Sequence, residues 1–186
     1  MIRFIIRSIL IILILILLAP IVFAIDTVTR DNLFTEVRIL CGAYGKVCYP
    51  REVKDDDYMW GQTRDNNTIV LSSGLIKNMN EAQVRGVLFH EVGHVVMRHV
   101  DRTIDYLYMC KLKCDPKVIA EMRRRYEYQA DRFATFVSIF THKEVDLEGA
   151  LIILTPKEEM NTVQDTHPST ADRIKAIQDI RRKYGE

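Results

Sequence analysis

The stretch "LFHEVGHVVMRH", residues 88–99, decides the fold and carries three of the chain's five histidines. On an α-helix, His90 and His94 lie one turn apart on the same face, and two neutral imidazoles at this spacing can bind one zinc ion. Glu91 is rotated off that line, where its carboxylate can reach a water molecule beside the metal and act as general base. His99 falls off the ligand face, and we expect it to be a structural or surface residue. The stretch thus predicts a helix with two metal ligands and a base.

The start of this helix is marked by a capping box. Asn80 is a good N-cap residue, and Gln83 follows it three residues later. Apolar residues then recur at helical spacing and supply a buried side: Val84, Val87, Leu88, Val92, Val95 and Val96. Gly93 removes a side chain next to the histidines, so that another element can approach the helix there.

A catalytic zinc ion needs a third protein ligand and one position left open for water. The segment "RRRYEYQAD", residues 123–131, supplies it on a second long helix that starts with Asp115 as N-cap and Pro116 at its first position. Glu127 can bind the metal, and Asp131, one turn further along, can accept a proton from the other nitrogen of a ligating histidine. Taken alone, this segment reads as a solvated helix face. Following the H-E-x-x-H pattern, it predicts a site for one zinc ion per chain.

The remaining patterns predict an α+β fold that is predominantly helical, with a small β-sheet ahead of the H-E-x-x-H helix. The best strand candidate is "TIVLS", residues 68–72, and Asp65-Asn66-Asn67 forms the turn before it. Further helices are expected over residues 31–40 and 147–154, and another begins at the N-cap Ser169.

Three separated motifs agree with one family. "HEVGH", then "EYQAD" and then "THPSTADRI" resemble the HtpX/BepA-like gluzincin metallopeptidases, the family that also holds the CAAX prenyl proteases. The resemblance implies a zincin-like metalloprotease domain with assigned site residues. The zinc ligands are then His90, His94 and Glu127, the catalytic base is Glu91, and the residues that face the metal and stabilise the reaction intermediate are His167 and Arg173. The chain lacks the multiple membrane spans of HtpX and the prenyl proteases, so it resembles the small exported members.

These parts predict a zinc metalloendopeptidase that hydrolyses exported or envelope proteins in protein quality control. An unfolded or extended polypeptide would pair with the edge of the strand at residues 68–72, because main-chain hydrogen bonding tolerates many sequences. One alternative is a zinc-containing chaperone or adaptor that binds unfolded exported proteins without cleaving them, although a pure binding module has no use for Glu91. Another is a structural, disulfide-linked envelope protein whose H-E-x-x-H pattern is fortuitous.

The N-terminal segment, residues 1–24, predicts export. Arg3 and Arg7 precede an apolar run, and Val22-Phe23-Ala24 ends it with small residues where a signal peptidase cleaves. An uncleaved membrane anchor is the alternative, because the apolar run is near the minimum of about 17 residues for crossing a bilayer. Either way the metallopeptidase domain, residues 25–186, would be exported to the periplasm or another extracytoplasmic compartment, secreted or anchored. The net charge of +1 gives no basic patch that would favour nucleic acid as a partner.

The four cysteines fit export, because an even number of cysteines in an oxidising compartment indicates disulfides. Local pairing is favoured, Cys41 with Cys48 and Cys110 with Cys114. The second pair should then span a helix end, since a Cys-x3-Cys spacing on a continuous helix suits disulfide geometry poorly. A cysteine zinc site is the weaker alternative.

Overall fold

The computed structural model of the chain describes residues 29–111, 113–156, 159 and 167–185. They belong to two compact units, one ending at Thr35 and the other beginning at Glu36. The predicted signal or anchor segment, residues 1–24, lies outside the described residues. Among the residues described, no helix is both long and apolar enough to cross a membrane. Residues 29–35 of the first unit are helical, and so are residues 36–43 of the second, which exceeds the expected range of 31–40.

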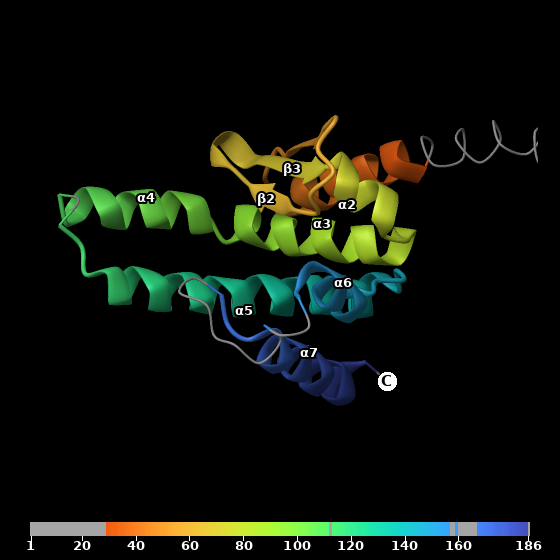
Figure 1. Ribbon diagram of the computed structural model, residues 1–186. Coiled ribbons are helices and arrows are strands. Elements are labelled where there is room, and N and C mark those ends of the chain that lie inside the picture. The colour runs from red at the N-terminus through yellow and green to blue at the C-terminus, as the bar shows by residue number, and fades with distance from the viewer. Residues whose placement is uncertain (1–28, 112, 157–158, 160–166, 186) are drawn as a thin grey trace, which may run out of the picture. The chain divides into compact units, whose positions relative to one another are not determined.

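A small sheet in the second unit packs on helix α3 (Figure 1). Its strands are β1 (Tyr49–Val53), β2 (Gly61–Thr63) and β3 (Thr68–Ser72). The strand order is β1-β3-β2, with β1 parallel and β2 antiparallel to β3. β3 is therefore the central strand, in agreement with its run of fully buried Ile69, Val70 and Leu71. The expectation that the edge of this strand binds substrate is wrong, because one of its edges pairs with β1 and the other with β2.

Helix α3 (Glu81–Val96) is buried along most of its length, which fixes the H-E-x-x-H residues in place. The Asn80 side chain accepts a hydrogen bond from the Gln83 backbone N–H, and the Gln83 side chain accepts one from the Asn80 N–H. This is the predicted capping box. The short helix α2 (Ser73–Asn78), capped by Ser72, leads into it from β3.

Helix α5 (Pro116–Thr141) lies between α3 and α7 (Thr170–Tyr184) in Figure 1 and packs against both. The approach of α5 to α3 depends on Gly93, because a Cβ atom there would lie 3.0 Å from the Cα atom of Ala130. Helix α6 (Leu147–Leu154) approaches α3 equally closely at Gly86, where a Cβ atom would lie 3.0 Å from the Leu147 Cα atom. Two glycines of α3 thus bring α5 and α6 close to the helix that carries His90 and His94.

Helix α4 (His99–Met109) is separated from α3 by Arg98, whose left-handed backbone (φ 58°) ends the preceding helix. Disulfides join Cys110 to Cys114 and Cys41 to Cys48, with Cα–Cα distances of 5.3 and 6.0 Å. This is the local pairing that the sequence favours. The Cys110–Cys114 bridge connects the end of α4 with the start of α5, so it spans a helix end as expected.

Candidate active site

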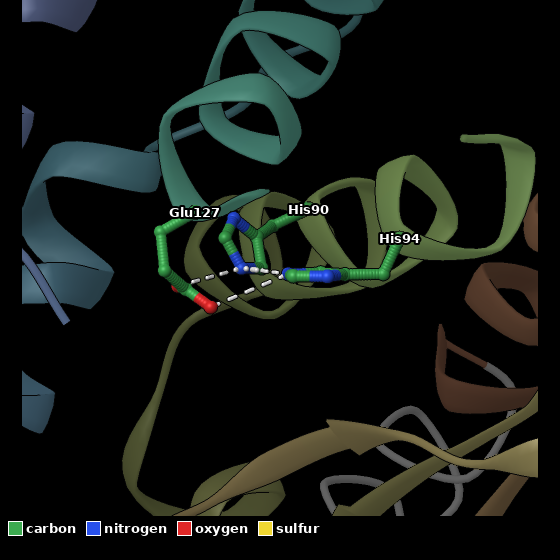
Figure 2. A group of neighbouring side chains, drawn as sticks. All are labelled: His90, His94 and Glu127. Atoms are coloured by element: carbon green, nitrogen blue, oxygen red, sulfur yellow. Dashed lines mark hydrogen bonds and ion pairs between the residues drawn. The ribbon is translucent and has the colours of Figure 1, made fainter. Parts of the chain in front are cut away.

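Three side chains from α3 and α5 point their donor atoms toward one another (Figure 2). The Nε2 atoms of His90 and His94 are 3.0 Å apart, and the Glu127 carboxylate oxygens lie 3.4 Å from the first and 3.6 Å from the second. Two ligand atoms at about 2.1 Å from a tetrahedral zinc ion are about 3.4 Å apart. The three donors therefore fit one zinc ion, and in the described part of the chain no other group of this kind is found.

Asp131 and Arg173 fix the orientation of the His90 ring. His90 Nδ1 donates to Asp131 Oδ1 over 2.8 Å, which leaves Nε2 for the metal. Arg173 donates two hydrogen bonds of 2.7 Å to the same carboxylate, from Nε to Oδ2 and from Nη2 to Oδ1. Its remaining nitrogen, Nη1, lies 3.3 Å from Glu127 Oε2. Arg173 thus holds two carboxylates of the site, and the role toward the reaction intermediate that the resemblance implies stays a prediction.

His99 holds the ring of His94, a contact that the sequence pattern does not reveal. The Nδ1 atoms of the two rings are 3.1 Å apart, and His99 Nε2 lies 2.9 Å from Gln129 Oε1. Because an amide oxygen only accepts, we assign the proton of His99 to Nε2, so that its Nδ1 accepts from His94 Nδ1 and leaves His94 Nε2 for the metal. His99 is buried and stacks on Tyr126 at a ring distance of 4.1 Å. Of the two roles expected for His99, structural or surface, the structure shows the structural one, and it adds a contact with the candidate ligand His94.

The position of His99 follows from the helix break. Helical spacing puts a residue five positions after His94 off the ligand face only if the helix continues. The left-handed Arg98 redirects the chain, and His99 returns to His94 as the first residue of α4.

Glu91 is buried next to the candidate ligand His90 in the sequence and contacts strand β2. Thr63 Oγ1 lies 2.7 Å from Glu91 Oε2, to which it donates, and 2.9 Å from the Glu91 carbonyl oxygen. Burial raises the pKa of Glu91 above its ordinary value, and the charge of Glu127 adds to this, whereas His90 and the Thr63 hydrogen bond lower it. A carboxylate with a raised pKa is a stronger base, and a general base is most effective when its pKa is near the working pH.

Without a metal ion, the two histidines carry different charges. Burial lowers the pKa of His90, but the hydrogen bonds to Asp131 and Glu127 outweigh it and raise the pKa to about 10. Burial, and then the positive charge of His90, lower the pKa of His94 to about 3. His90 is therefore cationic at neutral pH, and a zinc ion would replace its Nε2 proton.

His167 lies beside the candidate ligand Glu127, with its Nδ1 atom 3.5 Å from Glu127 Oε2 and about half of its side chain exposed. Burial raises the pKa of Glu127, but His167, His90 and Arg173 outweigh this and hold the pKa well below the usual range. Glu127 is thus an anion, as a carboxylate ligand must be. The role of His167 toward a reaction intermediate stays a prediction.

A cleft of about 1100 Å³ opens over these residues. Strand β2 and the preceding Met59 and Trp60 line it, as do residues of helices α3 to α7. This volume is slightly larger than the usual range for small-molecule sites, about 300–1,000 Å³. It can therefore accept several residues of a polypeptide.

Comparison with known proteins gives one family. The sequence model described as peptidase family M48 matches residues 52–114 and 111–181, two segments that together contain every residue of the site. A comparison with curated proteins gave no match.

Proposed function

The chain belongs to peptidase family M48 and is a zinc metallopeptidase, and we propose that it is an endopeptidase that cleaves unfolded or extended polypeptides outside the cytoplasm. One observation carries this proposal: three converging metal donors lie next to a buried carboxylate, at the floor of a cleft that can hold a peptide. The donor set of two imidazoles and one carboxylate leaves a fourth position for water, as in catalytic zinc sites.

His90, His94 and Glu127 would hold the metal ion. A zinc ion in such a site lowers the pKa of a bound water molecule to about 7 and polarises a carbonyl group. Asp131 and His99 keep the two imidazoles in the tautomers that present Nε2. These contacts between side chains prearrange the donors before the ion arrives.

Glu91 would act as the general base. It accepts the proton of the attacking water molecule and later delivers it to the leaving amine of the scissile peptide bond. Its raised pKa supports both steps, since a carboxylic acid with a higher pKa holds the proton until the amine takes it. Thr63 orients the carboxylate through one oxygen and leaves the other to meet the water molecule. His167 is the residue we assign to the developing oxyanion.

The substrate would bind as an extended strand along β2. In the described part of the chain β2 pairs only with β3, so its other edge is available to a peptide, and its residues line the cleft. Thr63 of this strand donates a hydrogen bond to Glu91, so a peptide bound on β2 would lie next to the proposed base. Main-chain pairing suits a protease for varied unfolded chains, because it does not depend on side-chain identity.

The two disulfides favour an oxidising, extracytoplasmic compartment. We keep residues 1–24 as a signal peptide or membrane anchor and residues 25–186 as the exported peptidase domain. Unfolded exported or envelope proteins are then the proposed substrates, and protein quality control is the proposed role.

Replacement of Glu91 by Gln tests this function. We expect Glu91→Gln to bind one zinc ion like the wild type and to lose cleavage of an unfolded protein substrate by about 100-fold or more, since it lacks a general base. Glu121→Gln is the matched control, because Glu121 is exposed on α5 and pairs only with the exposed Arg125 among the contacts described. Substantial zinc-dependent turnover by Glu91→Gln would sink the assignment of the base. If the zinc-loaded wild type binds unfolded protein but does not cleave it, the protein is a chaperone or adaptor. If the purified, folded wild type binds no zinc, its role is structural.

A further inference from the structure

Helix α4 has a stripe of apolar side chains that faces the cleft. Val100, Ile104 and Leu107 are spaced so that they share one helix face, and all three line the cleft. Ile104 remains 50% exposed in this position, so the described residues do not fully cover the stripe. Thr103 also lines the cleft beside them, whereas Asp101 and Asp105 of the same helix do not. The face of α4 that borders the cleft is therefore mainly apolar.

The stripe begins at the candidate metal centre. His99, the first residue of α4, contacts the ligand His94 and lines the same cleft. From α5, Arg123 and Tyr126 line it as well. The stripe and the ligands thus border one continuous cleft, and a chain bound at the metal can continue along α4.

The length of the stripe sets how much substrate it can contact. At a rise of about 1.5 Å per residue, α4 extends about 12 Å from His99, which contacts His94, to Leu107. An extended peptide covers about 3.3 Å per residue. The stripe therefore reaches about four residues beyond the scissile bond.

We propose that the α4 stripe is a substrate-binding surface that selects apolar side chains up to about four residues from the scissile bond, on one side of it. The inference rests on the proposed endopeptidase function and adds a substrate class to it. Strand β2 binds main chain and does not discriminate, whereas Ile104 and Leu107 remove apolar side chains from water. The preferred substrates are then polypeptide segments that a folded protein would bury. Such segments are exposed only in unfolded chains.

Peptide binding tests the proposal without requiring cleavage. Three fluorescein-labelled 12-residue peptides share a central sequence and carry leucines on the N-terminal side, leucines on the C-terminal side, or serines on both. Fluorescence anisotropy is measured with full-length, zinc-loaded Glu91→Gln, alone and combined with Ile104→Asn. One leucine peptide should bind about tenfold more tightly than the serine peptide, and Ile104→Asn should abolish that difference. Tyr108→Asn is the control, since Tyr108 is 85% exposed on α4 and does not line the cleft.

Cleavage by the otherwise wild-type protein gives a second readout. Ile104→Asn should raise KM about tenfold for the preferred leucine peptide and change KM for the serine peptide much less, whereas the Tyr108→Asn control should change neither value. Equal binding of all three peptides, or equal loss of all three in Ile104→Asn, would overturn the proposal. If the wild type proves to be a dimer in solution, its conversion to a monomer by Ile104→Asn with unaltered peptide binding would also overturn the proposal and assign the stripe to a second copy of the chain. Leucine-selective binding without cleavage by the wild type would instead keep the binding surface and reject the endopeptidase.

Discussion

Replacing Arg173 by Met removes a buried cation and keeps much of the side-chain volume. The guanidinium of Arg173 is almost inaccessible, and its partner Asp131 is 1% exposed. Removing one partner of a buried ion pair costs about 3–5 kcal/mol, because the other charge is left without compensation. His90 still donates to Asp131, so we expect the lower end, a loss of about 3 kcal/mol in the free energy of unfolding.

Urea denaturation of the metal-free protein measures this loss. Arg182→Met is the matched control, since Arg182 pairs with Asp179 at the surface with side chains 77% and 56% exposed. Exposed pairs contribute only about 0–1 kcal/mol. With zinc present the loss from Arg173→Met should be smaller, because the ion supplies positive charge beside Glu127. A loss below about 1 kcal/mol in the metal-free protein would refute the reasoning. Reduced kcat at full stability would then assign Arg173 to the reaction intermediate.

Three further predictions concern the ligands and the base. His99→Phe keeps a ring that can stack on Tyr126 but cannot accept a hydrogen bond from His94. We therefore expect the zinc affinity, measured against a competing chelator, to fall about 10- to 100-fold. An unchanged zinc affinity would show that His99 does not support the site. Because the pKa of His90 is about 10 without metal, zinc binding at pH 7–8 should release about one proton more than binding to a site of neutral imidazoles would. Calorimetry in buffers of different ionisation enthalpy measures the number of protons released. If no extra proton is released, the positive charge assigned to His90 is wrong. Thr63→Val removes a hydrogen bond that lowers the pKa of Glu91, so the pKa of Glu91 should rise. The acid limb of the pH profile of kcat/KM should then move to higher pH. An acid limb that stays in place would mean that Thr63 does not affect the pKa of the base.

Much of the site follows from local rules and can be predicted from the sequence. The i, i+4 spacing places His90 and His94 on one face wherever the segment is helical, and the Asn80–Gln83 box fixes where that helix begins. Glu127 and Asp131 repeat the same spacing on α5, so they reach the site together once Gly93 allows the two helices to approach.

What the sequence does not predict depends on contacts between distant segments. β2 has only three residues, Gly61–Thr63, and becomes a strand by pairing with β3; no periodicity marks so short an element. Its presence moves the sheet edge, and with it the proposed substrate strand, away from residues 68–72. Whether Arg173 meets carboxylates or a substrate is decided by how α7 packs on α5, a tertiary arrangement that spacing along one helix does not contain.

The most direct measurement is a zinc titration of the metal-free wild-type protein while cleavage of an unfolded substrate is followed. We expect no cleavage before zinc is added, a linear rise in rate, and saturation at one zinc ion per chain. Cleavage that persists without zinc, or a folded chain that takes up one zinc ion and never cleaves, would contradict a zinc endopeptidase built on His90, His94, Glu127 and Glu91.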